Sequence, residues 1–149
     1  RVCRPNGGEE SLVGQVMQRF EDWPTRLAAF IEAHLERAFS WGEADCCLFV
    51  CDGVEALTGH DPAARWRGLY TSEKAARRLM RDNGGVRGLA ALAFGPPVVT
   101  AMAGRGDVVL IDTPAGEALA LHAGNVIAAQ GEHGIEFHPI GAAKAAWKI

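Results

Sequence analysis

The fold of this chain is decided by residues 39–47, which read Phe39-Ser40-Trp41-Gly42-Glu43-Ala44-Asp45-Cys46-Cys47 and lead into an apolar run. Asp45 is a good N-cap residue, so the sequence predicts a helix that begins at Cys46 and stops before Gly59. Cys46 then lies in the first helical turn, where unpaired backbone N–H groups and the helix dipole favour a thiolate. Trp41, Gly42 and Asp45 are expected to line a cleft at this helix start. The alternative is a buried, inert cysteine on an amphipathic helix.

Composition narrows the classes of protein that the chain can belong to. With 149 residues, 48% of them apolar, the sequence predicts one domain over residues 17–149 and an N-terminal extension over residues 1–16. The formal net charge of −3 and scattered basic residues argue against a nucleic-acid partner. The longest uncharged stretch, residues 88–104, is interrupted by Gly95-Pro96-Pro97, so no membrane span is expected.

The four cysteines, Cys3, Cys46, Cys47 and Cys51, fit neither a disulfide framework nor a zinc site, because there is no Cys-x-x-Cys pair. We therefore expect no metal and no cofactor. A redox or metal module centred on Cys46, Cys47 and Cys51 remains as a distant alternative.

Hydrophobic periodicity changes along the chain from a helical to a strand pattern. Helices are predicted within residues 19–37, 46–57, 72–82 and 86–93. Strands are predicted over residues 106–111, 118–122, 126–129 and 134–140. Helices first and an antiparallel sheet second indicate an α+β domain.

Three segments together resemble a known family. They are Trp41-Gly42-x-x-Asp45-Cys46 with its apolar helix, Gly106-Asp107-Val108-Val109-Leu110, and Leu121-His122-Ala123-Gly124-Asn125. This combination resembles the NlpC-type papain-like cysteine peptidases, which cut peptide stems of the bacterial cell wall. The resemblance implies a papain-like fold, with the cysteine helix packed on a C-terminal antiparallel sheet. Residues 20–24, 39–42 and 145–149 further resemble small phage and prophage tail proteins related to those peptidases.

The resemblance assigns roles to individual residues. Cys46 matches the nucleophile, and the place of the catalytic histidine falls at Ala118 when the Gly124-Asn125 turn is used as the anchor. The third, orienting residue falls near Ala128 or Ala129, with Gln130 as the closest polar side chain. His122 is the candidate base, although it lies four residues, or roughly 13 Å, beyond Ala118 along a strand. A shifted register or a bulge would have to bring it to Cys46.

Two functions follow from the resemblance. One is a peptidoglycan stem-peptide hydrolase of the phage tail tip, with Cys46 and His122 as its catalytic residues. The other is a degenerate peptidase fold that serves as a structural part of the tail tip or baseplate and contacts neighbouring tail proteins, through Trp66, the first helix or the N-terminal extension. Both place the protein in the virion tail, with other tail proteins and, for a hydrolase, peptidoglycan as partners.

Overall fold

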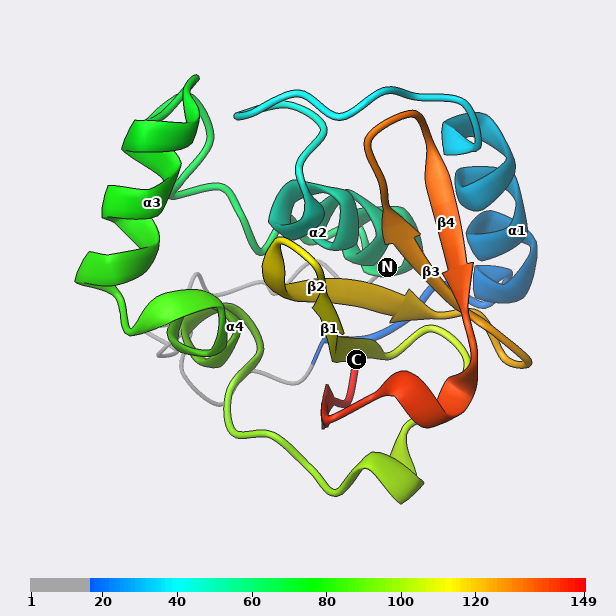
Figure 1. The fold of residues 1–149 in the computed structure, drawn as a ribbon. Helices are drawn as coiled ribbons and strands as arrows, with labels where there is room; N and C mark the ends of the chain where they lie inside the picture. Colours follow the sequence, from blue (N-terminus) through cyan, green and yellow to red (C-terminus); the bar gives the residue numbers. More distant parts are fainter. Residues whose placement is uncertain (1–16) are drawn as a thin grey trace, which may run out of the picture.

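A computed structural model describes residues 17–149 as an α+β fold (Figure 1). Its helices are α1 (Trp23–His34), α2 (Cys46–Thr58), α3 (Glu73–Asp82) and α4 (Gly85–Phe94), followed by a short 3-10 turn, η1 (Thr100–Met102). The strands are β1 (Val108–Thr113), β2 (Gly116–His122), β3 (Ile127–Gln130), β4 (Ile135–His138) and β5 (Ala145–Trp147), and η2 (Ile140–Ala142) precedes β5.

The helices begin and end where the capping residues predict. Pro24 lies in the first turn of α1, and Ser72 Oγ accepts a hydrogen bond from Ala75 N at the start of α3. Gly59 ends α2 in the left-handed conformation with φ of 75°. The predicted helix over residues 19–37 is shorter than expected at both ends, because the segments on either side form turns and loops.

The strands form one antiparallel sheet in the order β4-β3-β2-β1-β5. The antiparallel order confirms the coarse fold class. Strand β5 was not predicted, since it is three residues long and contains two alanines. Its strand conformation depends on pairing with β1, with Val108 opposite Trp147.

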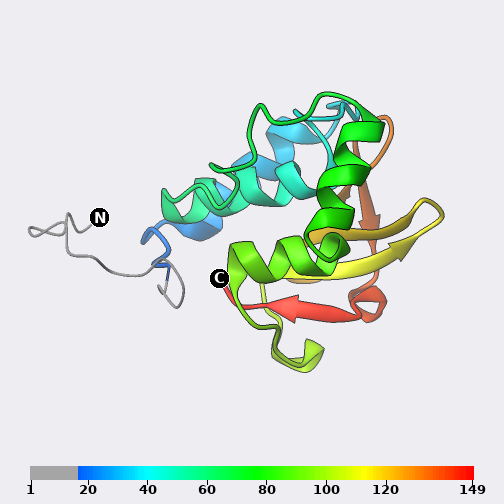
Figure 2. The ribbon, with the colours of Figure 1, turned by 90° about the vertical axis from the view of Figure 1, so that its left-hand side faces the viewer.

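The two faces of the sheet are covered by different parts of the chain. On the helical face, Leu110, Leu119 and Leu121 belong to the core that includes residues from all four helices. On the outer face, Val109 and Ile111 pack instead with alanines of β2, β3 and β5 and with residues flanking η1 and η2. Figure 2 shows η1 and η2 on the opposite side of the sheet from α1 and α2.

Helix α2 lies directly on β2 because a glycine faces the sheet. A Cβ atom at Gly53 would come within 2.6 Å of Leu121 Cδ1 and 3.2 Å of Phe30 Cε2. The missing side chain therefore permits the close approach that brings the N-terminal turn of α2 next to the middle of β2.

Within residues 17–149, none of the helices has the length and apolar character needed to cross a membrane.

Candidate functional site: the Cys46 cavity

The start of α2 is held by the buried carboxylate of Asp45. Asp45 Oδ1 accepts a hydrogen bond from Leu48 N at 2.9 Å, which is the N-cap interaction expected from the sequence. Its Oδ2 accepts from Gly42 N at 3.0 Å and from the hydroxyl of Tyr70 at 2.6 Å. One carboxylate thus joins the preceding loop, the helix and a residue 25 positions further along the chain. The sequence offered no sign of the Tyr70 contact.

Gly42 shapes this loop and does not line the cavity. Its φ of +85° is left-handed, and a Cβ atom there would collide with the carbonyl of Tyr70. Trp41 does line the cavity, and its ring packs edge to face against Phe39 with centroids 4.7 Å apart. The loop that carries both rings is held by the turn between β3 and β4, since Phe39 N donates to Glu132 O at 2.9 Å.

Cys46 is half-buried in the first turn of α2, as predicted, with its Sγ 3.9 Å from the Sγ of Cys47. A hydrogen bond from the Cys47 thiol lowers the pKa of Cys46, and the backbone N–H of Leu119 acts in the same direction, against the effects of burial and of the Asp45 charge. The pKa of Cys47 is raised by the same thiol pair, and burial raises the pKa of Cys51. Cys46 is therefore the one of these three that forms a thiolate most readily.

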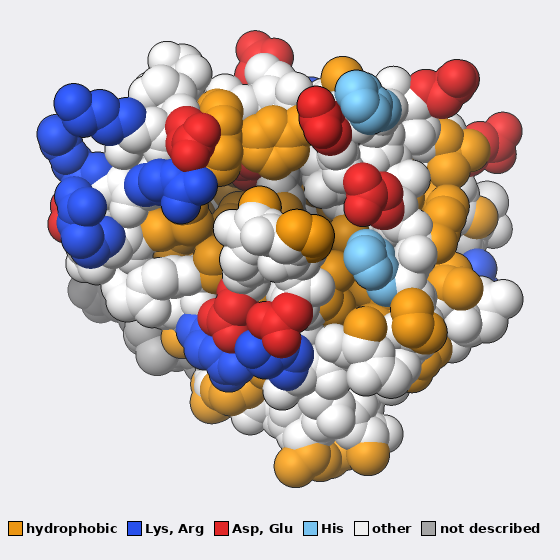
Figure 3. Space-filling model, viewed as in Figure 1, with side chains coloured by type: hydrophobic (Ala, Val, Ile, Leu, Met, Phe, Trp, Pro, Cys, Tyr) orange, Lys and Arg blue, Asp and Glu red, His pale blue; other side chains and the backbone are white. Residues whose placement is uncertain are grey.

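A cavity of about 750 Å³ opens in front of Cys46, and Figure 3 shows it as a hollow with an apolar interior. This volume lies in the range of ligand sites in proteins. Its walls come from the loop before α2, from α2 to α4, and from β2 and β3, with mainly aromatic and aliphatic side chains. Trp66 is one of them, and because only 9% of it is exposed it is not the exposed interface anchor considered from the sequence.

His122 lies on the other face of the sheet from Cys46. It pairs with Ile127, an outer-face residue, whereas Leu119 and Leu121 beside it face the helices. The structure therefore does not bring the two predicted catalytic residues together, and no bulge shifts the register of β2 against β1. Ala118, the place at which the resemblance puts the catalytic histidine, is among the residues that line the cavity, but its side chain packs against the outer-face cluster.

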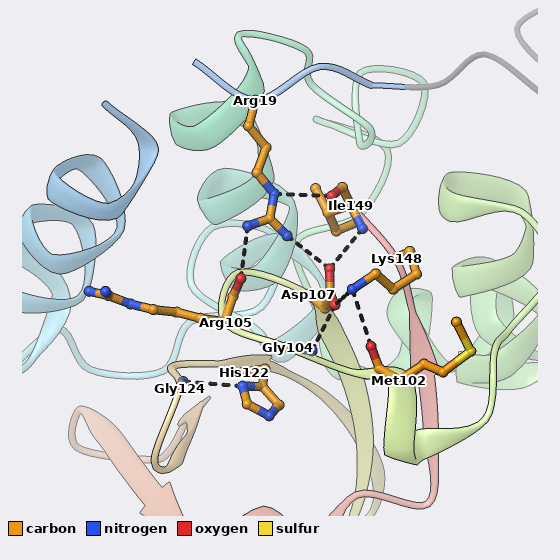
Figure 4. Close-up of polar contacts among 9 residues, drawn as sticks. All are labelled: Arg19, Met102, Gly104, Arg105, Asp107, His122, Gly124, Lys148 and Ile149. Atoms are coloured by element: carbon orange, nitrogen blue, oxygen red, sulfur yellow. Dashed lines mark hydrogen bonds and ion pairs between the residues drawn. The ribbon is translucent and has the colours of Figure 1, made fainter. Parts of the chain in front are cut away.

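The surroundings of His122 are those of a structural histidine (Figure 4). Its Nδ1 accepts a hydrogen bond from Gly124 N at 3.1 Å, and burial lowers its pKa. Nearby, the fully buried Asp107 binds Arg19 Nη2 at 2.9 Å and Lys148 Nζ at 2.6 Å. This cluster ties the segment before α1 and the end of β5 to the start of β1.

None of the five histidines of the chain lines the Cys46 cavity. Gln130, the polar side chain that the sequence gave as closest to the third catalytic place, does line the cavity and is 8% exposed. In the described part of the chain, no group of three potential metal ligands lies together, and Cys46, Cys47 and Cys51 are free thiols. Cys3 lies outside the described residues.

Comparison with known protein families gives a match over most of the chain. The model of the family described as "Domain of unknown function (DUF6950)" matches residues 18–149. The chain belongs to this family. A search of curated proteins found no match. The family description names no activity.

Replacing Asp45 by alanine tests the role of the carboxylate. We expect Asp45→Ala to lower the free energy of unfolding by at least about 2 kcal/mol, because an N-cap is lost and two further donors, one of them buried, lose their acceptor. Tyr70→Phe removes one of the same hydrogen bonds and should cost about 1 kcal/mol. Urea denaturation measures both, and an equal or smaller loss for Asp45→Ala would contradict the assignment.

Alkylation tests the order of thiol pKa values. At pH 7, iodoacetamide should modify Cys46 before Cys47 and Cys51, because the lowered pKa of Cys46 gives it the largest thiolate fraction and the other two have raised pKa values. As the pH increases, the rate at Cys46 should reach its plateau first. Peptide mapping by mass spectrometry reads each site. Faster modification of Cys51 would show that the thiol environments are misassigned.

Proposed function

We propose that this chain is a phage tail-tip or baseplate protein with a papain-like, NlpC-type fold, in which the Cys46 cavity binds a partner and does not cleave peptides. The observation that carries this proposal is the position of His122 on the outer face of the sheet while Cys46 lies on the helical face. A cysteine peptidase needs a base within hydrogen-bond reach of the nucleophile, and no histidine lines this cavity.

The peptidase-like fold is supported by the arrangement around Cys46. A cysteine in the first turn of a helix, packed on an antiparallel sheet that follows it in the chain, is the arrangement that the resemblance implies. The polar Gln130 lies on the neighbouring strand and lines the same cavity. The tail assignment depends on the resemblance of residues 20–24, 39–42 and 145–149 to phage and prophage tail proteins.

One observation favours a second function, a peptidoglycan stem-peptide hydrolase. The lowered pKa of Cys46 is a property of nucleophilic cysteines, and the cavity is large enough for a peptide side chain. This function needs a base from elsewhere, since bringing His122 to Cys46 would require β2 to turn over in the sheet. A general base contributes about 10²–10⁴-fold to such reactions, so the site as described is at best a weak hydrolase.

Incubation with cell-wall material separates the two functions. We expect purified protein, incubated with peptidoglycan from a Gram-negative host, to release no stem-peptide fragments detectable by mass spectrometry above those of Cys46→Ala. A known peptidoglycan hydrolase serves as the positive control, and circular dichroism establishes that both variants are folded. Fragments that appear with the natural protein and vanish with Cys46→Ala would overturn the binding proposal in favour of the hydrolase.

A further inference from the structure

We propose that copies of this chain associate head to tail, with the basic face of α3 in one copy against an acidic surface at the end of α1 in the next. The inference goes beyond the proposed function, because it does not depend on what the Cys46 cavity binds or on the chemistry of the thiol. The basic face comprises Lys74, Arg78 and Arg81, and the acidic surface comprises Glu32, Glu36, Glu43, Glu132 and Glu136.

Most charged side chains outside these two surfaces are paired with one another. The pairs include Asp22–Arg26, Asp52–Arg67, Asp61–Arg67, Asp107–Arg19, Asp107–Lys148, Asp112–Lys144, Glu117–Lys144 and Glu117–Arg87. Beyond the basic face, the lysines and arginines that form no ion pair within the described residues are Arg65 and Arg105. Beyond the acidic surface, the exposed carboxylates that form none there are Glu21, Glu55 and Asp82. The unpaired charges are therefore largely separated by sign.

The basic face of α3 points away from the body of the protein. Lys74, Arg78 and Arg81 follow one another at spacings of four and three residues, so they share one side of the helix. The opposite side carries the buried Ala76 and the residues that pack against the core. Asp82, at the last position of α3, leaves three unpaired cations against one unpaired anion. The helix thus presents an uncompensated positive charge.

The acidic surface is built by two segments that are joined to each other. The last turn of α1 and the loop before α2 lie against the turn between β3 and β4, where Phe39 N donates to Glu132 O at 2.9 Å. All five carboxylates are exposed, and among the described residues Glu132 alone has an ion-pair partner, His133 at 3.9 Å. Arg37 in the same loop does not neutralise them, because it pairs with Asp52 at 3.8 Å.

The two surfaces lie at opposite ends of the molecule. Figure 1 shows α3 on one side of the fold, and α1 with the β3–β4 turn on the other. In Figure 3, Lys and Arg side chains gather over α3, and Asp and Glu side chains lie over the opposite end. A contact between opposite ends is heterologous, so it repeats from copy to copy and forms a ring or a filament. Complementary potentials select this orientation, whereas the net charge of −3 opposes others.

Sedimentation velocity of the full chain tests the contact. At about 0.01 M salt, where charges interact over about 30 Å, we expect the sedimentation coefficient to rise with protein concentration. At about 1 M salt, where this range is about 3 Å, the protein should sediment as a monomer. A protein that stays monomeric at low salt would overturn the inference. Association that stops at a dimer would contradict the head-to-tail arrangement.

Charge reversal tests where the contact lies. Arg78→Glu with Arg81→Glu, and separately Glu36→Lys with Glu132→Lys, should each weaken association at low salt by at least about tenfold. The matched controls make the same changes of charge elsewhere: Arg65→Glu with Arg105→Glu, and Glu21→Lys with Glu55→Lys. These should have a much smaller effect. An equal loss in the controls would show that only the net charge matters, and would contradict the assigned surfaces.

Reversing both surfaces in one chain tests whether they meet each other. The variant that combines Arg78→Glu, Arg81→Glu, Glu36→Lys and Glu132→Lys keeps the net charge of the natural protein and exchanges the signs of the two surfaces. We expect association to return to nearly the natural level. An equimolar mixture of the two double variants restores the same attraction between separate chains and should also associate. If the folded double variants do not associate when mixed, the inference is wrong.

Discussion

The buried carboxylate of Asp45 is the interaction on which the rest of the site depends. It caps α2 through Leu48 N, closes the turn at Gly42 and accepts the hydroxyl of Tyr70. The cap places Cys46 in the first turn of the helix, and the closed turn holds Trp41 at the cavity wall. The same carboxylate also raises the pKa of Cys46 through its charge. Asp45 therefore fixes the position of the Cys46 thiol, while its negative charge disfavours ionisation of that thiol.

The second constraint is the alternation of side chains along β2. Adjacent residues of a strand point to opposite faces, so a single step along the chain decides whether a side chain meets α2 or the outer layer. Leu119 and Leu121 take the helical face, which leaves Ala118, Ala120 and His122 on the outer face. On the helical face, the β2 residue beside Cys46 is therefore Leu119 and not a histidine.

Local chemistry made the helices predictable. The caps at Ser72 and Asp45, the proline at position 24 and the glycine at position 59 mark the helix ends within a few residues, because these signals act over short distances. The sequence also predicted strands β1 to β4, and it placed Cys46 and Gln130 near the site. It did not predict strand β5, because a three-residue segment with two alanines forms a strand only where it pairs with β1.

The faces of the sheet could not be deduced from the sequence, and this limited the prediction of the site. Residues 108–111 are apolar at every position because both faces of the sheet are covered, so no alternation shows which residues meet the helices. The sequence correctly put His122 and Ala118 on one face, but it gave no sign of which face that was. The hydrogen bond from Tyr70 to Asp45 and the unpaired oxygen of Gln130 depend equally on contacts between distant segments.

The pH dependence of Cys46 alkylation in the natural protein and in His122→Asn tests the central claim most directly. If the two residues lie on opposite faces of the sheet, the midpoint of the Cys46 profile will be the same in both proteins. In a cysteine–histidine pair the imidazolium stabilises the thiolate. A midpoint that moves to higher pH in His122→Asn would therefore show that the two side chains interact, and would contradict the account.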